Sequence, residues 1–456
     1  MKKNIIKYAV CLALPLGGVG GELHAQPKWS YEDCVQYAIE HNIDVQRRML
    51  DVQMSENDLD TATKDWLPTV TAGIAQQFSF GNALASTGTM PSSSGQVDSD
   101  LSYTSAGVSA EMTLFDGFRT QNRVKAARWQ VRQTMASLDH ARKDLSIQVA
   151  VYYLQALYEE GMAKVAETQV ETSRQLYQRT KALVDDGKNP KSDLADAEAQ
   201  LAADEYDLTE CRGRARIALL TLSQLLNLKS AADFQIVDFS DDEIIKGDII
   251  DSQTLFNDIA DRYPSIEVVK AQVEKSKYDI QTARAGYYPQ LKLRASLNTY
   301  YQNFFNTSSE LSSLSAMTTH RHFPGQMWHN RSELIGLHLT VPVFDHSTTR
   351  NNIRRARMSL ADNQLLLDDV RQKLHKEIEQ AYHNAYNARE KFQSALKAQE
   401  ASQLSFTFEQ DKYDSGRSTL YDLTQATQRL RQARENAVQA KYEFIIREKI
   451  LAVYAK

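Results

Sequence analysis

The chain has 456 residues, a net charge of −5 and a charged fraction of 24%. A charge this close to balance gives no strongly basic surface, so we expect no nucleic-acid partner. The 18 glycines and 9 prolines are few for an all-β protein of this length and favour long helices.

The N-terminal segment has the composition of a secretory signal peptide. Basic residues at its start precede an apolar run over residues 9–19, and small residues follow up to Ala25. This order fits export better than the alternative, a short buried helix. We therefore expect residues 1–25 to be a cleaved signal peptide. Beyond it, no apolar run reaches the ~18–20 residues that a membrane-spanning helix needs.

The next part of the chain is predicted to contain a helix followed by a pair of strands. The residues from Ser30 to Asp33 form a capping-box pattern that starts a helix, and Pro68 ends the helical pattern that follows. Apolar and polar residues then alternate over about residues 69–80 and again over about residues 103–115. This period of two indicates strands with one apolar face, joined by a polar loop.

Very long helices follow each strand pair. After Gly117, only Gly161 interrupts the helical pattern before Gly187, a length on the order of 100 Å at 1.5 Å per residue. Helices of this length must pack side by side. After Gly416, small and apolar residues recur at the alternating three- and four-residue spacing of a coiled-coil seam: Leu423, Ala426, Leu430, Ala433, Ala437, Ala440 and Phe444.

The second half of the chain repeats the first. Gly416 follows Gly187 by 229 positions, and Phe344 follows Phe115 by the same 229. A constant register over this distance indicates an internal tandem duplication. The repeat predicts a second strand pair at about residues 290–301 and 333–344, separated by a second polar loop.

The duplication also divides the chain. We expect a first structural repeat over residues 26–232 and a second over residues 254–456. The segment between them, residues 233–253, is predicted to contain one short strand at residues 233–239, followed by an acidic linker.

Four strands of about 10–12 residues with one apolar face are typical of an outer-membrane barrel. The alternative, the edge of a soluble β-sandwich, does not explain why so few strands lie between such long helices. Four strands cannot close a barrel, and an open sheet edge is forbidden in lipid. The protomer must therefore oligomerise, and a homotrimer would supply twelve strands.

These features together resemble the TolC-type outer-membrane efflux channels, also called outer membrane factors. The resemblance covers nearly all of the mature sequence. The matching features are the strand entries that end in Pro68 and Pro289, the Leu-Phe-Asp-Gly and Val-Phe-Asp-His motifs, and two Gly-x5-Asp-Leu-x2-Ala turns.

The resemblance implies a mixed α and β membrane protein in the cell outer membrane. A trimeric 12-stranded β-barrel, with four strands per protomer, would be continued by a long periplasmic α-helical coiled-coil barrel. The implied function is the passive exit duct of a tripartite system that exports drugs or small solutes. Its partners would be outer-membrane lipid, a periplasmic adaptor protein and an inner-membrane pump, either an RND or an ABC transporter.

Two other functions remain open from the sequence. The same duct could serve a type I protein secretion system, and the channel body would be identical. A trimeric coiled-coil surface adhesin without a pore is the third class. The adhesin would not need two strand pairs in each duplicated chain.

The resemblance also implies a gate at the periplasmic end of the helices. Asp422 matches the first position of an acidic ring, whereas Gln425 stands at the second position, so the ring would carry three charges per trimer instead of six. Tyr413, Ser192 and Asp193 match three positions of a latch that keeps the gate closed.

The latch of the family also contains an arginine, and this chain departs from that pattern. Ser418 occupies the arginine position, and Arg417 lies one residue before it. Either Arg417 replaces the missing latch residue, or it is a solvated surface side chain. The exposed turns that contain Gly187, Lys188, Gly416 and Ser418 are the expected contacts for the adaptor.

We find no motif for catalysis, so we expect no enzyme activity and no cofactor. The loop over residues 317–329 contains histidines and methionines without a fixed ligand spacing, and an ordinary polar loop is the alternative to a metal site. Cys34 and Cys211 lie on separate helical patterns, where small apolar packing residues are expected more often than a disulfide.

Overall fold

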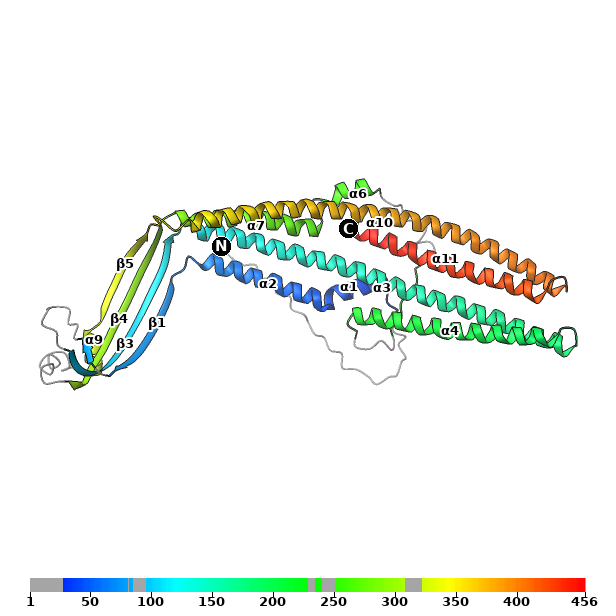
Figure 1. Cartoon of the computed structure of the whole chain (residues 1–456), viewed down its shortest axis with the longest axis horizontal. Helices are drawn as coiled ribbons and strands as arrows, with labels where there is room; N and C mark the ends of the chain where they lie inside the picture. The colour runs from blue at the N-terminus through cyan, green and yellow to red at the C-terminus, as the bar shows by residue number, and fades with distance from the viewer. Residues whose placement is uncertain are drawn as a thin grey trace, which may run out of the picture.

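The computed structural model describes residues 28–80, 82–84, 96–228, 234–239, 251–307 and 322–455. It is an elongated molecule with a sheet of long strands at one end and a layer of long helices over the rest of its length (Figure 1). The predicted signal peptide, residues 1–25, lies outside the described residues.

The elements follow the duplicated order that the sequence predicts. The strands are β1 (Thr69–Ser79), β2 (Asn82–Leu84), β3 (Gln96–Phe115), β4 (Gln290–Thr307) and β5 (Ser332–Thr340). The helices are α1 (Tyr31–His41), α2 (Ile43–Lys64), α3 (Arg119–Asp185), α4 (Lys191–Leu225), α6 (Ser252–Ile259), α7 (Pro264–Arg284), α9 (Phe323–His329), α10 (Thr348–Asp414) and α11 (Leu420–Ala455), with the 3-10 turn η1 (Ala285–Tyr287) after α7.

Side-chain caps determine where the first two helices begin. Ser30 Oγ accepts a hydrogen bond from Asp33 N at 3.1 Å, and the Asp33 carboxylate accepts one from Ser30 N at 3.2 Å. This reciprocal pair is the predicted capping box. The sequence pattern did not indicate the break at Asn42, where the amide oxygen accepts a hydrogen bond from Asp44 N at 2.8 Å and starts α2.

The four main strands form an antiparallel sheet in the order β1-β3-β4-β5. Their register aligns Val70, Ala110, Ala295 and Ile335 in one row on one face. This face is apolar and uncovered within the protomer, since the Ile335 side chain is 82% exposed. The pattern is that of a lipid-facing barrel wall.

The strand ends differ from the predictions for a pairing reason. β3 begins at Gln96, earlier than predicted, because past the end of β1 it pairs with β4 from Ser99 and with the short β2 over residues 96–98. β4 ends at Thr307, later than predicted, because it continues to pair with β3 as far as Ser99. β5 stops at Thr340 instead of about residue 344. Thr340 pairs with Gln290, the first residue of β4, so no partner backbone remains beyond it.

The short helix α9 lies in the predicted second loop and covers the edge of β4 beyond β5. Gln326 Oε1 accepts a hydrogen bond from Gln302 N at 3.1 Å, and Asn330 Nδ2 donates one to the Tyr300 carbonyl at 2.9 Å. These side chains satisfy backbone groups that β5 does not reach, because β5 begins opposite Asn298.

Each of the two longest helices, α3 and α10, has 67 residues. α3 packs against α2, α4, α7 and α11, and α10 packs against α7 and α11. Figure 1 shows α2 and α7 beside the part of these helices near the sheet, and α4 and α11 beside the distant part. Among the helices that the structure describes, none is long and apolar enough to cross a membrane.

The predicted coiled-coil seam forms the contact surface of α11. All seven seam residues from Leu423 to Phe444 are buried. Gly161 does not interrupt α3; it allows α11 to approach closely, since a Cβ at this position would lie 2.9 Å from Val438 Cγ1 and 3.1 Å from Tyr442 Cε2.

The predicted strand at residues 233–239 is reduced to a single parallel bridge between Trp29 and Ile236. Trp29 N donates to the Gln235 carbonyl at 2.9 Å, and Val237 N donates to the Trp29 carbonyl at 3.0 Å. The hydroxyl of the buried Tyr153 lies 2.6 Å from the Val237 carbonyl oxygen and fixes this segment on α3.

We predict that Gly161→Leu lowers the free energy of unfolding by about 1–3 kcal/mol, because the added side chain pushes α3 away from α11. The higher helix propensity of leucine, worth roughly 1 kcal/mol, offsets only part of this. Thermal denaturation followed by circular dichroism measures the change. Lys164→Leu, at an exposed position on the same helix, is the control and should leave the melting temperature nearly unchanged. Equal melting temperatures for the two variants would contradict the close-contact role of Gly161.

Candidate gate at the helix tips

The two turns at the distant end of the helices have the same backbone hydrogen bonds. Gly187 N donates to the Val184 carbonyl and Lys188 N to the Leu183 carbonyl. The bonds of Gly416 to Tyr413 and of Arg417 to Lys412 repeat them 229 residues later. This is the Schellman arrangement, which requires positive φ at its glycine. Gly187 and Gly416 have φ of 73° and 68°.

Asp422 belongs to a reciprocal cap at the start of α11. Its carboxylate accepts a hydrogen bond from the Thr419 hydroxyl at 2.6 Å, and Thr419 Oγ1 accepts one from Asp422 N at 3.2 Å. These bonds to the Thr419 hydroxyl and backbone lower the pKa of Asp422. Asp422, the residue at the expected ring position, therefore carries an ionised, oriented carboxylate at neutral pH.

Ser418, which stands at the family's arginine position, connects the two helices of its hairpin. Its hydroxyl donates to Glu409 on α10 and lies 3.5 Å from the Asp422 carboxylate. Lys412 Nζ also contacts Glu409, at 2.9 Å. The Ser418 hydroxyl and Lys412 together lower the pKa of Glu409.

Gln425, at the second ring position, lies in a row of polar side chains along α11. Its Nε2 donates to the Tyr421 hydroxyl at 2.8 Å, and Arg429 Nη2 donates to its Oε1 at 3.2 Å. The neighbouring charge along α11 is therefore the positive charge of Arg429, one turn C-terminal to Gln425, and Gln425 itself carries no carboxylate.

Asp193 lies at the start of α4, where Asn189 Nδ2 donates to it at 3.2 Å and Ser192 Oγ at 3.4 Å. Asp193 lines a cavity of about 590 Å³ together with Tyr421 and Thr424 of α11. The structure thus places Asp193 toward the first turn of α11, with Ser192 as a hydrogen-bond donor to its carboxylate.

Tyr413 lies in a different cavity of the same tip, between α3, α10 and α11. The Arg179 guanidinium lies 5.6 Å from the centre of its ring and forms an ion pair with Asp414. The Tyr413 hydroxyl is buried and has no hydrogen-bond partner in the described part of the protomer. The Arg417 side chain is exposed. Within one protomer, neither Tyr413 nor Arg417 forms a hydrogen bond or ion pair with Asp193.

A buried charge cluster further from the tip connects three helices. Arg431 of α11 contacts the carboxylates of Asp204 and Asp207 on α4 at 3.1 and 2.7 Å, and that of Glu435 at 2.9 Å. Asp204 is 1% exposed and also accepts hydrogen bonds from Ser173 and from Gln169. Burial opposes the charge on Arg431, but the hydrogen bonds to its carboxylates outweigh it and raise the Arg431 pKa.

The sequence analysis did not identify this cluster, although one signal for it exists. The seam of α4 runs through Ala197 and Leu201, and the next three-residue step reaches Asp204. A carboxylate at a seam position must be paired or it would carry a large desolvation cost.

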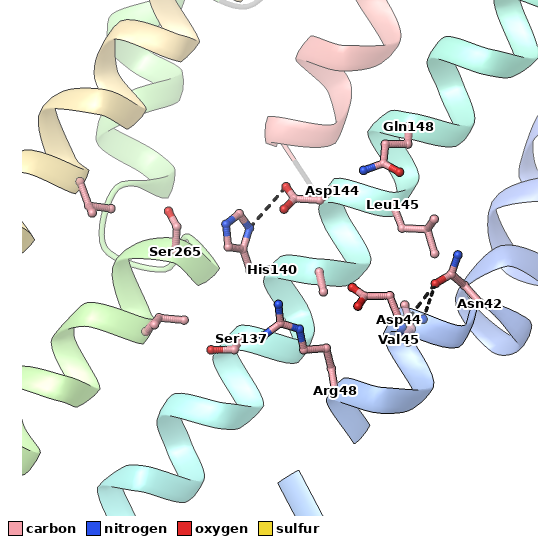
Figure 2. Close-up of a pocket in the computed structure, with 13 residues that line it drawn as sticks. Asn42, Asp44, Val45, Arg48, Ser137, His140, Asp144, Leu145, Gln148 and Ser265 are labelled. Atoms are coloured by element: carbon pink, nitrogen blue, oxygen red, sulfur yellow. Dashed lines mark hydrogen bonds and ion pairs between the residues drawn. The ribbon is translucent and has the colours of Figure 1, made fainter. Parts of the chain in front are cut away.

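Besides the two cavities at the tip, a groove lies about midway along the helical layer, where α2 and α7 begin beside α3. It has a volume of about 550 Å³ and is lined by both polar and apolar side chains (Figure 2). His140 Nδ1 lies 3.5 Å from Asp144 Oδ1, and Asn42 caps α2 at the groove margin. Arg48 of α2 also lines this groove. The groove lies in the wall of the helical layer, far from the tip turns.

The possible metal ligands and the two cysteines of the mature chain can be located in part. No group of three or more His, Cys, Asp or Glu side chains there could hold a metal ion. His322 and Met327 of the predicted loop lie at α9, whereas residues 308–321 fall outside the described ranges. Cys34 and Cys211 are buried free thiols.

The fold agrees with a family assignment from sequence comparison. The family model for outer membrane efflux proteins matches residues 34–228 and 255–454. The chain belongs to the outer membrane efflux protein family. It is an outer-membrane protein, and its long helices form the periplasmic extension typical of such channels.

Individual relatives and solved structures agree with this assignment. The chain is 21% identical to the outer membrane efflux protein BepC of Brucella suis biovar 1 over 75% of this chain and 69% of BepC. It is 21% identical to the alkaline protease secretion protein AprF of Pseudomonas aeruginosa over 78% of this chain and 69% of AprF. The Campylobacter jejuni CmeC outer membrane channel has the same fold, with a TM-score of 0.75, 15% identity and coverage of 100% of this chain and 94% of CmeC.

We predict that Arg431→Met lowers the free energy of unfolding by roughly 2–4 kcal/mol, because it leaves Asp204 buried without its cation. Denaturant unfolding followed by circular dichroism measures the loss. The double variant Arg431→Met/Asp204→Asn should recover part of it, since it removes both charges. Arg429→Met, at an exposed position on α11, is the control and should change stability by less than about 0.5 kcal/mol. A loss for Arg429→Met as large as that for Arg431→Met would contradict the assignment.

Proposed function

We propose that the protein is the passive exit duct of a tripartite export system for drugs or small solutes. Three copies form a twelve-stranded barrel in the outer membrane and a helical tunnel in the periplasm. A periplasmic adaptor and an inner-membrane pump open the tunnel. Membership of the efflux family supports the general function, and the two complementary edges of the protomer support the trimer.

The observation that supports this proposal most directly is that the sheet of one protomer has two open edges. β1 and β5 are the edge strands of the sheet, and β1 runs antiparallel to β5. Successive copies can therefore pair β5 with β1 and continue the antiparallel order until the sheet closes. Such closure removes the unpaired edges that lipid does not tolerate.

The helices beside these two edges expose large apolar side chains. On α10, Leu365 is 69% exposed and Phe408 is 57% exposed. On the opposite edge, α2 exposes Met54 and α4 exposes Tyr206 and Ile217. Exposed apolar rows at both edges are the expected surfaces of an interface between copies of the chain.

We predict that the double variant Leu365→Asp/Phe408→Asp prevents trimer formation, because each interface would bury two unpaired carboxylates. Light scattering of the detergent-solubilised protein should give the mass of one chain instead of three. The variant Leu365→Met/Phe408→Met keeps both positions apolar and should remain trimeric. If the aspartate variant also remained trimeric, α10 would not be the protomer interface.

The gate is proposed to lie at the tips, where Asp422 forms a ring of three carboxylates around the axis. Asp193 and Ser192 would receive a latch contact from a neighbouring copy. Tyr413 is the third proposed latch residue, and its hydroxyl, which is buried without a hydrogen-bond partner within the described part of the protomer, would have to turn outward to make such a contact. Arg417, exposed beside Ser418, is the candidate for the missing arginine. The turns at Gly187, Lys188 and Gly416, with Ser418, are the proposed contacts for the adaptor.

We predict that Asp193→Ala increases single-channel conductance in planar bilayers, because the closed packing of the tips loses a charge-assisted contact. In cells the same variant should raise sensitivity to vancomycin. Asp196→Ala removes a neighbouring carboxylate of the same cavity and is the control. Unchanged conductance and unchanged sensitivity in Asp193→Ala would exclude the latch.

Type I protein secretion is the second candidate function, and similarity to the secretion protein AprF favours it. Crosslinking in intact cells, followed by purification of whatever is bound at the tips, distinguishes the two. An adaptor recovered with an RND pump supports solute efflux. An adaptor recovered with an ABC transporter is compatible with either function, and assays of secreted proteins in a deletion strain then decide.

A further inference from the structure

Both long helices carry basic residues at the same place just beyond the sheet. Lys125 and Arg128 of α3 correspond to Arg354 and Arg357 of α10 at the 229-residue shift. No acidic residue occurs between residues 119 and 138 of α3 or between residues 348 and 361 of α10. We call Lys125, Arg128, Arg354 and Arg357 the basic belt.

The belt residues are exposed and available for a ligand. In the part of the protomer that the structure describes, Arg128, Arg354 and Arg357 have no ion pair or hydrogen bond to another side chain. Lys125 has an aromatic contact, since its Nζ lies 5.6 Å from the centre of the Tyr278 ring. Four cations per protomer therefore stand without counter-charges at equivalent positions of the two repeats.

The direction of Arg357 follows from the period of its helix. Arg357 and Arg371 are fourteen residues apart, which is two heptads, so they lie on the same side of α10 in a coiled-coil layer. Arg371 reaches Asp261, in the segment that follows α6, at 3.6 Å. α6 packs against α10, and Figure 1 shows it on the margin of the helical layer. A helix on the inner side would obstruct a duct, so this side of α10 faces outward.

The height of the belt follows from the helix rise. α3 begins four residues after Phe115, the last residue of the strand. Lys125 and Arg354 lie roughly 9 Å into their helices and Arg128 and Arg357 roughly 14 Å, at 1.5 Å per residue. The lipid headgroup layer extends about 5–8 Å beyond the hydrocarbon core. Long basic side chains reach several ångströms along the helix toward such a layer.

We propose that the basic belt binds the phosphate groups of anionic phospholipids in the periplasmic leaflet of the outer membrane. The proposal rests on the membrane orientation in the proposed function. It follows from the exposure of the belt close to the sheet, its lack of counter-charges and its repetition in both halves. Six such basic pairs would surround a trimer and hold its barrel at a fixed depth.

The experiment compares spin-labelled phosphatidylglycerol with spin-labelled phosphatidylcholine in phosphatidylcholine vesicles that contain the full-length protein. Electron paramagnetic resonance measures the motionally restricted fraction of each lipid. The wild-type protein should prefer phosphatidylglycerol by about fivefold, the ratio expected for one basic contact near a membrane surface. The variant Lys125→Gln/Arg128→Gln/Arg354→Gln/Arg357→Gln should lose most of this preference.

Two controls make the result specific. Arg128→Lys/Arg354→Lys/Arg357→Lys keeps the charges and should keep the preference. Lys181→Gln/Lys397→Gln removes exposed charges far from the sheet and should also keep it. A wild-type protein without preference, or a quadruple glutamine variant that retains it, would overturn the proposal.

The oligomeric state and conductance of the same samples separate this outcome from failure of the proposed function. A conducting trimer without a preference for phosphatidylglycerol would contradict lipid binding by the basic belt and leave the proposed duct intact. A monomer without conductance would contradict the proposed duct, and with it the lipid-binding role of the basic belt.

Discussion

Backbone N–H and C=O groups at a sheet edge cannot remain unpaired in hydrocarbon, and the rest of this molecule depends on that constraint. One protomer supplies four membrane strands with two open edges, so it cannot be a finished membrane protein. The same edges continue into α10 on one side and into α2 and α4 on the other, where apolar side chains are exposed. Assembly of the sheet and assembly of the helical layer therefore satisfy one requirement together.

The duplicated architecture is carried by local features that the sequence displays. Gly187 and Gly416 predict the two tip turns because a Schellman turn needs positive φ, and the three- and four-residue spacing predicts the α11 seam because buried small residues let helices pack closely. The strand faces were predictable for the same kind of reason. Alternation of apolar and polar residues is a property of the strand itself and needs no knowledge of its partners.

Features that depend on distant partners could not be read in this way. The length of β5 is set by where β4 begins, and α9 exists because the edge of β4 beyond Asn298 needs donors and acceptors. The charge cluster of Arg431 and Asp204 joins residues 227 positions apart. At the candidate gate, sequence reasoning identified Asp422 and Asp193 but not Asn189, the partner of Asp193. The positions of Asp422 and Asp193 relative to a neighbouring copy are set by the assembly of the trimer and not by the sequence of one helix.

The contacts between the two repeats have a mechanical consequence for the tunnel. Within a protomer, α3 is tied to α10 by Arg179 and Asp414, and α4 to α11 by Arg431 and Asp204. Shifted by 229 positions, these pairs become Phe408 with Asp185 and Ala202 with Ala433. If the repeats are equivalent in the trimer, the joint between protomers lacks both ion pairs, and we expect the wall to be stiff within each protomer and more compliant at the three joints between protomers. Dilation of the tunnel will be concentrated at those three joints.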